Sequence, residues 1–210
     1  AKGSTMNGVL KLAGNGVYGN SNNPYSCFYD PQYTFTVTLN GQLQLLQLVE
    51  LLSMIPGLEL IQANTDGITV YMPRDMDAWF QLWKSEWEQD TGLKLEEVTY
   101  SHMWIRDVNN YIARTIDGKI KLKGAYWYPK SEAEYDGWWN KDFSQMVVQK
   151  VTEQVLITGH QVEDVIKLVT NPFDFMLRYK TPGGAKVYIG EKEMLKTVRY
   201  YVSTRGEPMK

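Results

Sequence analysis

Residues 58–72 read LELIQANTDGITVYM. Two apolar runs, 58–61 and 68–71, flank the tetrapeptide Asn64-Thr65-Asp66-Gly67. Asp-Gly between apolar runs is the strongest short-range signal for a β-hairpin. We therefore expect two antiparallel strands joined by a tight turn that carries Asp66 at its tip. A plain surface turn explains the same residue types and stays open as the alternative.

Helical patterns lie on both sides of this hairpin. Before the hairpin, apolar residues recur at helical spacing until Pro56-Gly57. After it, Asp75 is expected to be the N-cap of a second helix. Four aromatic residues lie on one face of that helix: Trp79, Phe80, Trp83 and Trp87. Later segments have strand-like composition. The expected helices are 5–18, 33–55, 76–90, 141–158 and 161–170, the expected strands are 93–105, 108–115 and 119–127, and 176–203 is mixed.

The order of these elements predicts the fold class. A helix, a hairpin, a helix and then successive strands indicate an antiparallel α+β domain with flanking helices, not a parallel βαβ one. The change from strand-like to helical periodicity places a boundary near 130–138. The region beyond that boundary is expected to be mostly helical.

Composition excludes several classes of protein. The chain has 210 residues, 43% hydrophobic and 22% charged, which is typical of a globular protein. A net charge of −2 argues against strong nonspecific binding of polyanions, although local basic stripes matter more than the sum. Eighteen consecutive apolar residues do not occur, so we expect no membrane partner or membrane span. The single cysteine, Cys27, fits a reducing compartment, and we expect a cytoplasmic protein.

Three polar groups share one face of the first expected helix. Lys11, Asn15 and Tyr18 stand at positions i, i+4 and i+7. A cation, an amide and a phenol on one stripe suit a ligand that carries phosphates and a ring. A solvated helix face with one buried tyrosine is the alternative.

Two stretches in the strand-rich region could contact a polyanion. Asn109-Asn110-Tyr111 puts polar groups at the start of a strand. Lys119, Lys121 and Lys123 alternate with apolar residues and would lie on one strand face about 6.6 Å apart, roughly the phosphate spacing of a nucleic-acid strand. A simple strand entry and a solvated sheet face are the respective alternatives.

The turn of the hairpin is suited to metal binding. A carboxylate on a tight turn is rigidly aimed, and Mg²⁺ takes one or two protein carboxylates together with phosphate oxygens. Two such ions assist an in-line phosphoryl displacement. Asp66 alone cannot build that site, so a further carboxylate must converge on it.

In this order, the stretches resemble the C-terminal half of a family B DNA polymerase of the kind found in bacteriophages. Lys11, Asn15 and Tyr18-Gly19 are similar to the fingers motif K-x3-N-S-x-Y-G, and Asn64-Thr65-Asp66-Gly67 is similar to the palm motif D-T-D-S. Asn109-Asn110-Tyr111 stands where the family has K-x-Y, and the tail 199–203 resembles the thumb. The resemblance implies an end of the fingers at 1–32, a palm at 33–132 and a partial thumb at 133–210.

The sequence also departs from the family pattern. Gly16 replaces the serine of the fingers motif, Asn64 replaces the first aspartate of the palm motif, and Asn109 replaces the lysine of K-x-Y. The family's motif D-x-x-S-L-Y-P, which carries the other catalytic carboxylate, is not found before Lys11. We therefore expect either a fragment or one chain of a split polymerase, with that aspartate on an N-terminal polymerase segment or a partner chain.

The resemblance implies a reaction and a role for each matched residue. Asp66 and the second carboxylate would hold two Mg²⁺, and the primer 3′-hydroxyl would attack the α-phosphate of a dNTP and release pyrophosphate. Lys11 would contact the triphosphate, and Asn15 and Tyr18 would line the sugar and the nascent base pair. Primer–template DNA would be held by a larger set: Asn110, Tyr111, Lys119, Lys121 and Lys123. The competing hypotheses are a non-catalytic DNA-binding or assembly subunit of similar fold, and an unrelated α+β protein.

Overall fold

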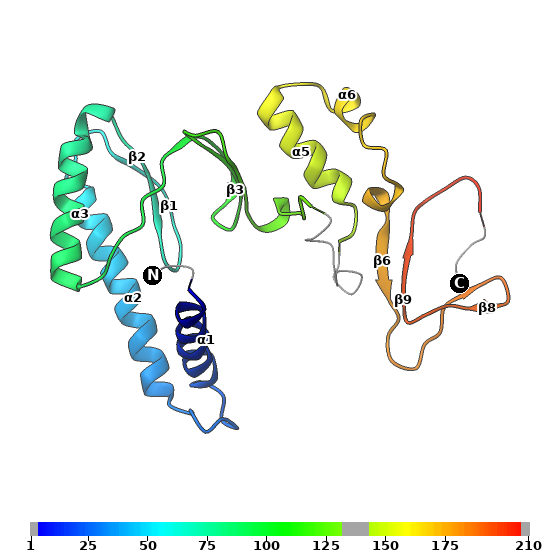
Figure 1. The fold of residues 1–210 in the computed structure, drawn as a ribbon, viewed down its shortest axis with the longest axis horizontal. Helices are drawn as coiled ribbons and strands as arrows, with labels where there is room; N and C mark the ends of the chain where they lie inside the picture. The colour runs from blue at the N-terminus through cyan, green and yellow to red at the C-terminus, as the bar shows by residue number, and fades with distance from the viewer. Residues whose placement is uncertain (1–3, 132–142, 207–210) are drawn as a thin grey trace. The chain divides into compact units, whose positions relative to one another are not determined.

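The computed structural model describes residues 4–131 and 143–206. The chain forms two compact units, Ala1–Glu97 and Val98–Lys210, each of which combines helices with small antiparallel sheets (Figure 1). The fold is therefore α+β, as expected. The expected palm, 33–132, includes parts of both units, and the boundary expected near 130–138 lies largely outside the described residues. Among the described helices, none is long and apolar enough to cross a membrane.

The first unit begins with two helices that match the expected ones. Helix α1 is Thr5–Asn20, and the Ser4 side chain caps its start by accepting from Asn7 N–H at 3.2 Å. Helix α2 is Pro31–Leu52, and its N-cap is Asp30. Proline at the first helical position explains why α2 starts before residue 33.

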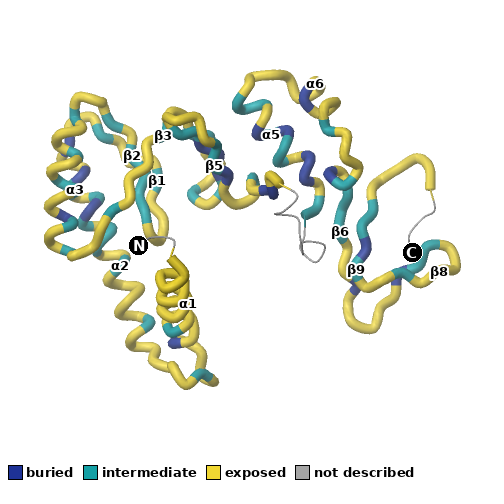
Figure 2. The backbone as a smooth tube through the Cα atoms, in the orientation of Figure 1, coloured by how far each residue is buried: buried dark blue, intermediate teal, exposed yellow. Residues whose placement is uncertain are grey.

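Hydroxyl groups connect the two helices. The Tyr18 hydroxyl lies 2.8 Å from the Thr38 Oγ1, and the Ser21 Oγ lies 2.6 Å from the Thr34 Oγ1. Ser21 is buried, whereas α1 has no buried residue, and Figure 2 shows it as an exposed helix. Polar contacts near its C-terminus therefore hold α1, without an apolar core of its own.

The hairpin packs with α2 and α3 around one core. Strand β1, Glu59–Ala63, pairs antiparallel with β2, Ile68–Tyr71, and helix α3 is Asp77–Thr91. The indole Nε1 of Trp87 donates to the Gln44 carbonyl at 2.8 Å and so links α3 to α2. The buried centre consists of Leu48, Leu52, Ile55 and Trp87.

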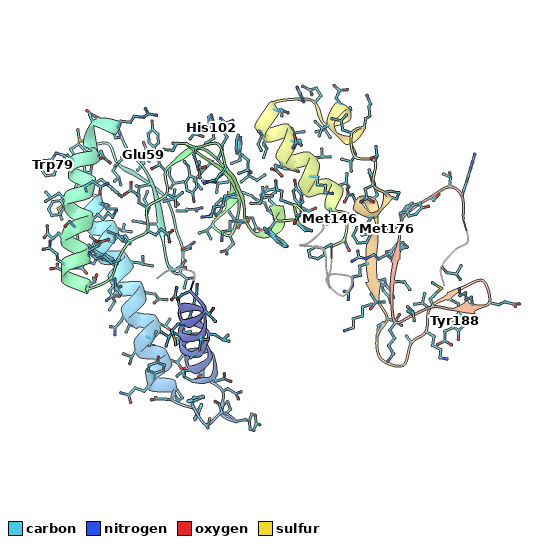
Figure 3. All side chains as sticks on the ribbon, viewed as in Figure 1. Glu59, Trp79, His102, Met146, Met176 and Tyr188 are labelled. Atoms are coloured by element: carbon cyan, nitrogen blue, oxygen red, sulfur yellow. The ribbon has the colours of Figure 1, made fainter. Side chains whose placement is uncertain are left out.

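The N-cap expected for α3 is wrong, and the aromatic residues on its expected face are buried to different degrees. Asp75 is not its N-cap but lies in a 3₁₀ turn, η1 (Arg74–Met76), and Met76 precedes the helix without a side-chain cap. Trp79 is 51% exposed, while Trp87 is 3% exposed; Figure 3 shows Trp79 on the outer side of α3. Each four-residue step advances about 40° around a helix, so a residue two steps before Trp87 leaves the core face.

The second unit begins with a three-stranded antiparallel sheet in the order β3-β4-β5. Its strands are Tyr100–Asp107, Asn110–Thr115 and Ile120–Leu122. The expected strand 93–105 starts later, because Glu88 in α3 accepts from Leu95 N–H at 2.8 Å and ties that segment to unit one. The expected strand 119–127 ends early, at the 3₁₀ turn η2 (Gly124–Tyr126).

Helix α5, Met146–Thr158, packs in the second unit's core with Ile112, Leu122 and Tyr128. The first two residues of the helix expected over 141–158 lie outside the described residues. Among the described ones the helix starts at Met146, because Gln145 has a φ of 53° and its N–H donates to the Met176 carbonyl at 2.8 Å. A short helix, α6 (Val162–Ile166), replaces the longer one expected over 161–170.

The end of the chain is built mainly from short strands. A 3₁₀ turn, η4 (Pro172–Phe175), leads into β6 (Leu177–Lys180), which pairs antiparallel with β9 (Thr197–Tyr200). Between them lies a small hairpin of β7 (Tyr188–Ile189) and β8 (Lys192–Glu193). This matches the mixed region expected at 176–203, but the expected description of the thumb as mostly helical is too broad.

Candidate functional site

The turn that carries Asp66 is organised by Asn64. The Asn64 Oδ1 accepts from the Asp66 N–H at 3.2 Å, and the Asn64 N–H donates to the Gly67 carbonyl at 2.9 Å. Gly67 has no positive φ, so this is not the Asp-Gly turn that the sequence signal suggested. The Asn64 side chain forms an Asx-turn, in which its amide oxygen takes the place of a backbone carbonyl. This structural role of Asn64 was not predicted from the sequence.

Asp66 stands exposed at the tip of the hairpin. In the described part of the chain, its carboxylate takes part in no hydrogen bond or ion pair, so both oxygens are accessible to a ligand. The described residues contain no group of three or more His, Cys, Asp or Glu side chains placed to hold a metal ion. The Asp66 carboxylate is thus one hard oxygen ligand of the kind that Mg²⁺ takes.

The α1 stripe lies in the same compact unit as Asp66. Lys11, Asn15 and Tyr18 are all within α1 and therefore lie along one of its faces, and all three are exposed. The buried-tyrosine alternative is wrong for Tyr18, which is 39% exposed. Its hydroxyl is fixed by Thr38 on α2, which limits the positions that the phenol ring can take.

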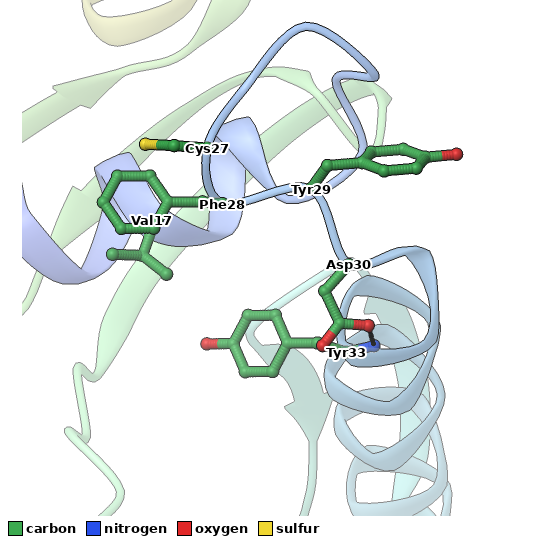
Figure 4. A pocket seen from close by; sticks show the side chains of 6 residues that line it. All are labelled: Val17, Cys27, Phe28, Tyr29, Asp30 and Tyr33. Carbon is green, nitrogen blue, oxygen red and sulfur yellow. Dashed lines mark hydrogen bonds between the residues drawn. The ribbon is translucent and has the colours of Figure 1, made fainter.

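A shallow hollow of about 400 Å³ lies between the end of α1 and the start of α2 (Figure 4). Its walls combine aromatic rings, the Cys27 thiol and Asp30. The carboxylate of Asp30 accepts from the Tyr33 N–H at 2.9 Å and caps α2, as the dashed line in Figure 4 shows. Asp30 is therefore already used as the N-cap of α2.

The second unit gives Asn110 a structural role. The Asn110 Nδ2 donates to both oxygens of Asp107, at 2.7 and 2.9 Å, and its Oδ1 accepts from the Ala125 N–H at 2.6 Å. These bonds connect the β3–β4 turn to η2. The hydrogen bond from Asn110 is also the main reason that the pKa of Asp107 is lowered. Tyr111 is only 7% exposed, so its ring lies in the core.

The three lysines around β5 are held differently. The Lys119 Nζ forms an ion pair with Asp117 at 2.8 Å, which raises the pKa of Lys119. The Lys121 Nζ donates to the Tyr100 hydroxyl at 3.0 Å and lies 5.7 Å from the centroid of that ring. Lys123 is exposed. Only Lys121 lies within β5, and Lys119 and Lys123 flank the strand on either side. Lys119 and Lys121 already have partners within the second unit.

A buried ionic network in the second unit was not predicted from the sequence. The Lys130 Nζ lies 2.5 Å from the Glu153 Oε1 and 2.7 Å from its Oε2, and the Oε2 also accepts from the Tyr128 hydroxyl. Glu153 is only 3% exposed. The Lys150 Nζ contacts both oxygens of Asp174 at 2.8 Å, and Asp174 is 2% exposed. These partners are far apart in the sequence, so periodicity could not reveal them.

The site residues thus fall into two groups. Asp66 and the α1 stripe present a carboxylate, a cation, an amide and a phenol on unit one, while unit two presents lysines. Residues 98–210 carry seventeen Lys or Arg against thirteen Asp or Glu, whereas residues 1–97 carry five against eleven. No protein-family model and no curated protein matches the chain.

Proposed function

We propose that the chain is the palm-and-thumb part of a template-directed DNA polymerase that adds dNTPs to a primer 3′-end. Asp66 would be the magnesium ligand contributed by this chain, and a second carboxylate would come from another polymerase segment or a partner chain. Bound magnesium supplies positive charge that stabilises the developing phosphoryl charge and lowers the pKa of a coordinated hydroxyl.

The exposed carboxylate of Asp66 is the observation that carries this proposal. A carboxylate used only to stabilise a turn accepts backbone N–H groups, but here the Asn64 amide does so. The Asp66 oxygens are left to face solvent at the tip of an antiparallel hairpin. The two strands pack on the core around Trp87, so the backbone position from which the Asp66 carboxylate projects is fixed.

The α1 stripe supports a nucleotide as the ligand. The Lys11 ammonium suits the triphosphate as a compact point charge. Asn15 lies one turn further along the helix and can donate and accept hydrogen bonds with a sugar. Tyr18, held by Thr38, presents a ring edge of fixed position, which suits a steric check on the sugar 2′ position.

Primer extension with Mg²⁺, dNTPs and a labelled primer–template tests the proposal. This chain alone should yield no product, because one carboxylate cannot hold two ions. Adding the segment that carries the second carboxylate should restore extension. Asp66→Asn should abolish that extension and leave primer–template binding nearly unchanged, whereas Asp90→Asn, an exposed acid on α3, should keep both.

Two further results sharpen the test. Lys11→Ala should slow extension by about 10²–10³-fold, the usual cost of removing a group that stabilises transition-state charge. Extension by the chain alone would show that the divided active site is wrong. Extension by the assembled Asp66→Asn variant at a comparable rate would overturn the metal-ligand role.

A non-catalytic DNA-binding or assembly subunit is the second candidate. The structural use of Asn64 favours it, because the side-chain oxygen at this departure from D-T-D accepts a turn N–H. Magnesium-dependent binding of a dNTP by the assembled protein, lost in Asp66→Asn, separates the two candidates. A binding subunit would bind DNA with equal affinity in the wild type and in Asp66→Asn, and neither protein would bind a dNTP in a magnesium-dependent way.

A further inference from the structure

Two arginines face each other on the C-terminal two-stranded sheet. Arg178 on β6 and Arg199 on β9 are direct partners in the antiparallel register. Opposed residues project from the same face with their Cβ atoms about 4.5–5.5 Å apart, and like charges in that position destabilise a sheet. Arginine stays protonated, so both side chains keep their positive charge.

The surroundings hold one guanidinium in place. The Arg199 Cζ lies 4.5 Å from the centroid of the Phe173 ring, and its Nη1 donates to the Phe143 carbonyl at 3.2 Å. Stacking on a ring uses the flat face of a guanidinium and leaves donors at its edge. Arg199 is therefore oriented by an aromatic ring and a carbonyl.

The other guanidinium lacks an acceptor within the described ranges. The Nε of Arg178 is buried without a hydrogen-bond partner there, whereas its backbone N–H donates to the Ser144 hydroxyl at 2.9 Å. Asp174, the acid next to Phe173, is engaged with Lys150. A buried donor without an acceptor is costly and marks a position where a ligand can bind.

We infer that Arg178 and Arg199 form a binding site for a phosphate group. An oxyanion bound there would give the Arg178 Nε its acceptor and would carry a charge opposite to that of both guanidinium groups. Arginine donors match phosphate oxygens in a two-pronged geometry. Lys180, two residues along β6 on the same face and exposed, adds positive charge at the rim.

The phosphate could belong to a polynucleotide backbone or be a free ion such as phosphate or pyrophosphate. The polynucleotide source rests on the proposed function, whereas the site itself does not. Binding of inorganic phosphate can be measured without any polymerase activity. A failure of the anion site is therefore distinguishable from a failure of the polymerase proposal, particularly in Asp66→Asn, which should bind phosphate normally.

Thermal unfolding in sodium phosphate and in sodium chloride of equal ionic strength is the first experiment. A ligand that binds only the folded state raises the unfolding midpoint with its concentration. The wild-type midpoint should rise in phosphate, and Arg178→Gln should lose that rise, with far-UV circular dichroism confirming its fold. Arg205→Gln, an exposed arginine outside the sheet, should keep it, and Arg178→Lys should keep only part of it.

Duplex DNA binding at several salt concentrations identifies the source of the phosphate. If it is DNA, Arg178→Gln should weaken binding equally for all sequences and reduce the salt slope by about 0.9. Phosphate stabilisation with unchanged DNA affinity would assign the site to a free ion. An equal rise of the unfolding midpoint in phosphate for wild type and Arg178→Gln would overturn the inference. The absence of a rise in both proteins would overturn it as well, and would show that the arginines are neutralised within the chain.

Discussion

Substituting Gly124 tests whether the Asn110 contacts are structural. Gly124 has a φ of +60°, and a Cβ atom there would lie 2.2 Å from the Asn110 Oδ1 and 2.3 Å from the Asn109 carbonyl oxygen. Both distances are far below a permitted contact, and one of the two atoms is backbone. Gly124→Ala must therefore displace Asn110 and the start of η2 together.

The expected cost follows from the contacts that are lost. A non-glycine residue in the left-handed region costs about 1–2 kcal/mol. Displacing Asn110 breaks its bond from Ala125 and its bonds to Asp107, which at this exposed position contribute about 1 kcal/mol each. We therefore expect Gly124→Ala to lower the free energy of unfolding by about 4–5 kcal/mol, the sum of the backbone strain and the three lost hydrogen bonds, which is a large share of the total for a typical domain.

Urea denaturation, followed by circular dichroism, measures this change, and Gly118→Ala is the matched control. Gly118 has a φ of +84°, but a Cβ atom at this position would have no other atom within 4 Å, so its substitution should cost about 1 kcal/mol from backbone strain alone. Equal destabilisation by the two substitutions would refute the reasoning, because the close contacts would then contribute nothing. A smaller effect of Gly124→Ala in an Asn110→Ala background would confirm the coupling.

Two further perturbations probe the second unit. Lys150→Met should lower the free energy of unfolding by about 3 kcal/mol, because it leaves the 2%-exposed Asp174 carboxylate buried without its cation. Thermal unfolding measures this loss. A loss below about 1 kcal/mol would contradict a stabilising role of the ion pair. The Lys119 hydrogen bond, with help from a threonine hydroxyl, lowers the pKa of Asp117 from 3.8 to about 2. Its stabilising contribution is therefore complete above about pH 4 and lost as the pH falls through about 2, so Asp117→Asn should flatten the pH dependence of unfolding in that window; an unchanged slope would refute it.

Local patterns predicted much of the first unit. The apolar spacing before Pro56-Gly57 located α2, and the apolar runs around Asn64 and Asp66 located the hairpin. These signals act over a few residues, so the sequence carries them directly. The position of Asp66 at an exposed tip follows from them, although the side chain that forms the turn was not anticipated.

Contacts between distant residues could not be predicted in this way. Tyr111 follows two polar residues at the start of a strand, so the sequence suggested an accessible side chain. In the sheet its ring is buried in the core. Asn110 and Gly124 meet only because β4 and η2 are adjacent, and the strand expected to continue to residue 127 ends there for that reason. The opposed arginines at 178 and 199 depend on the register of β6 and β9, which no periodicity specifies.

The single cysteine in the hollow beside α1 offers a route to labelling. Cys27 is exposed and is the only thiol in the sequence, so a maleimide fluorophore will attach at one site without engineering. That site lies in the loop between the helix that carries Lys11 and the helix that carries Thr38. The dye would sit among the Phe28, Tyr29 and Tyr33 side chains, so its emission would report a movement of either helix.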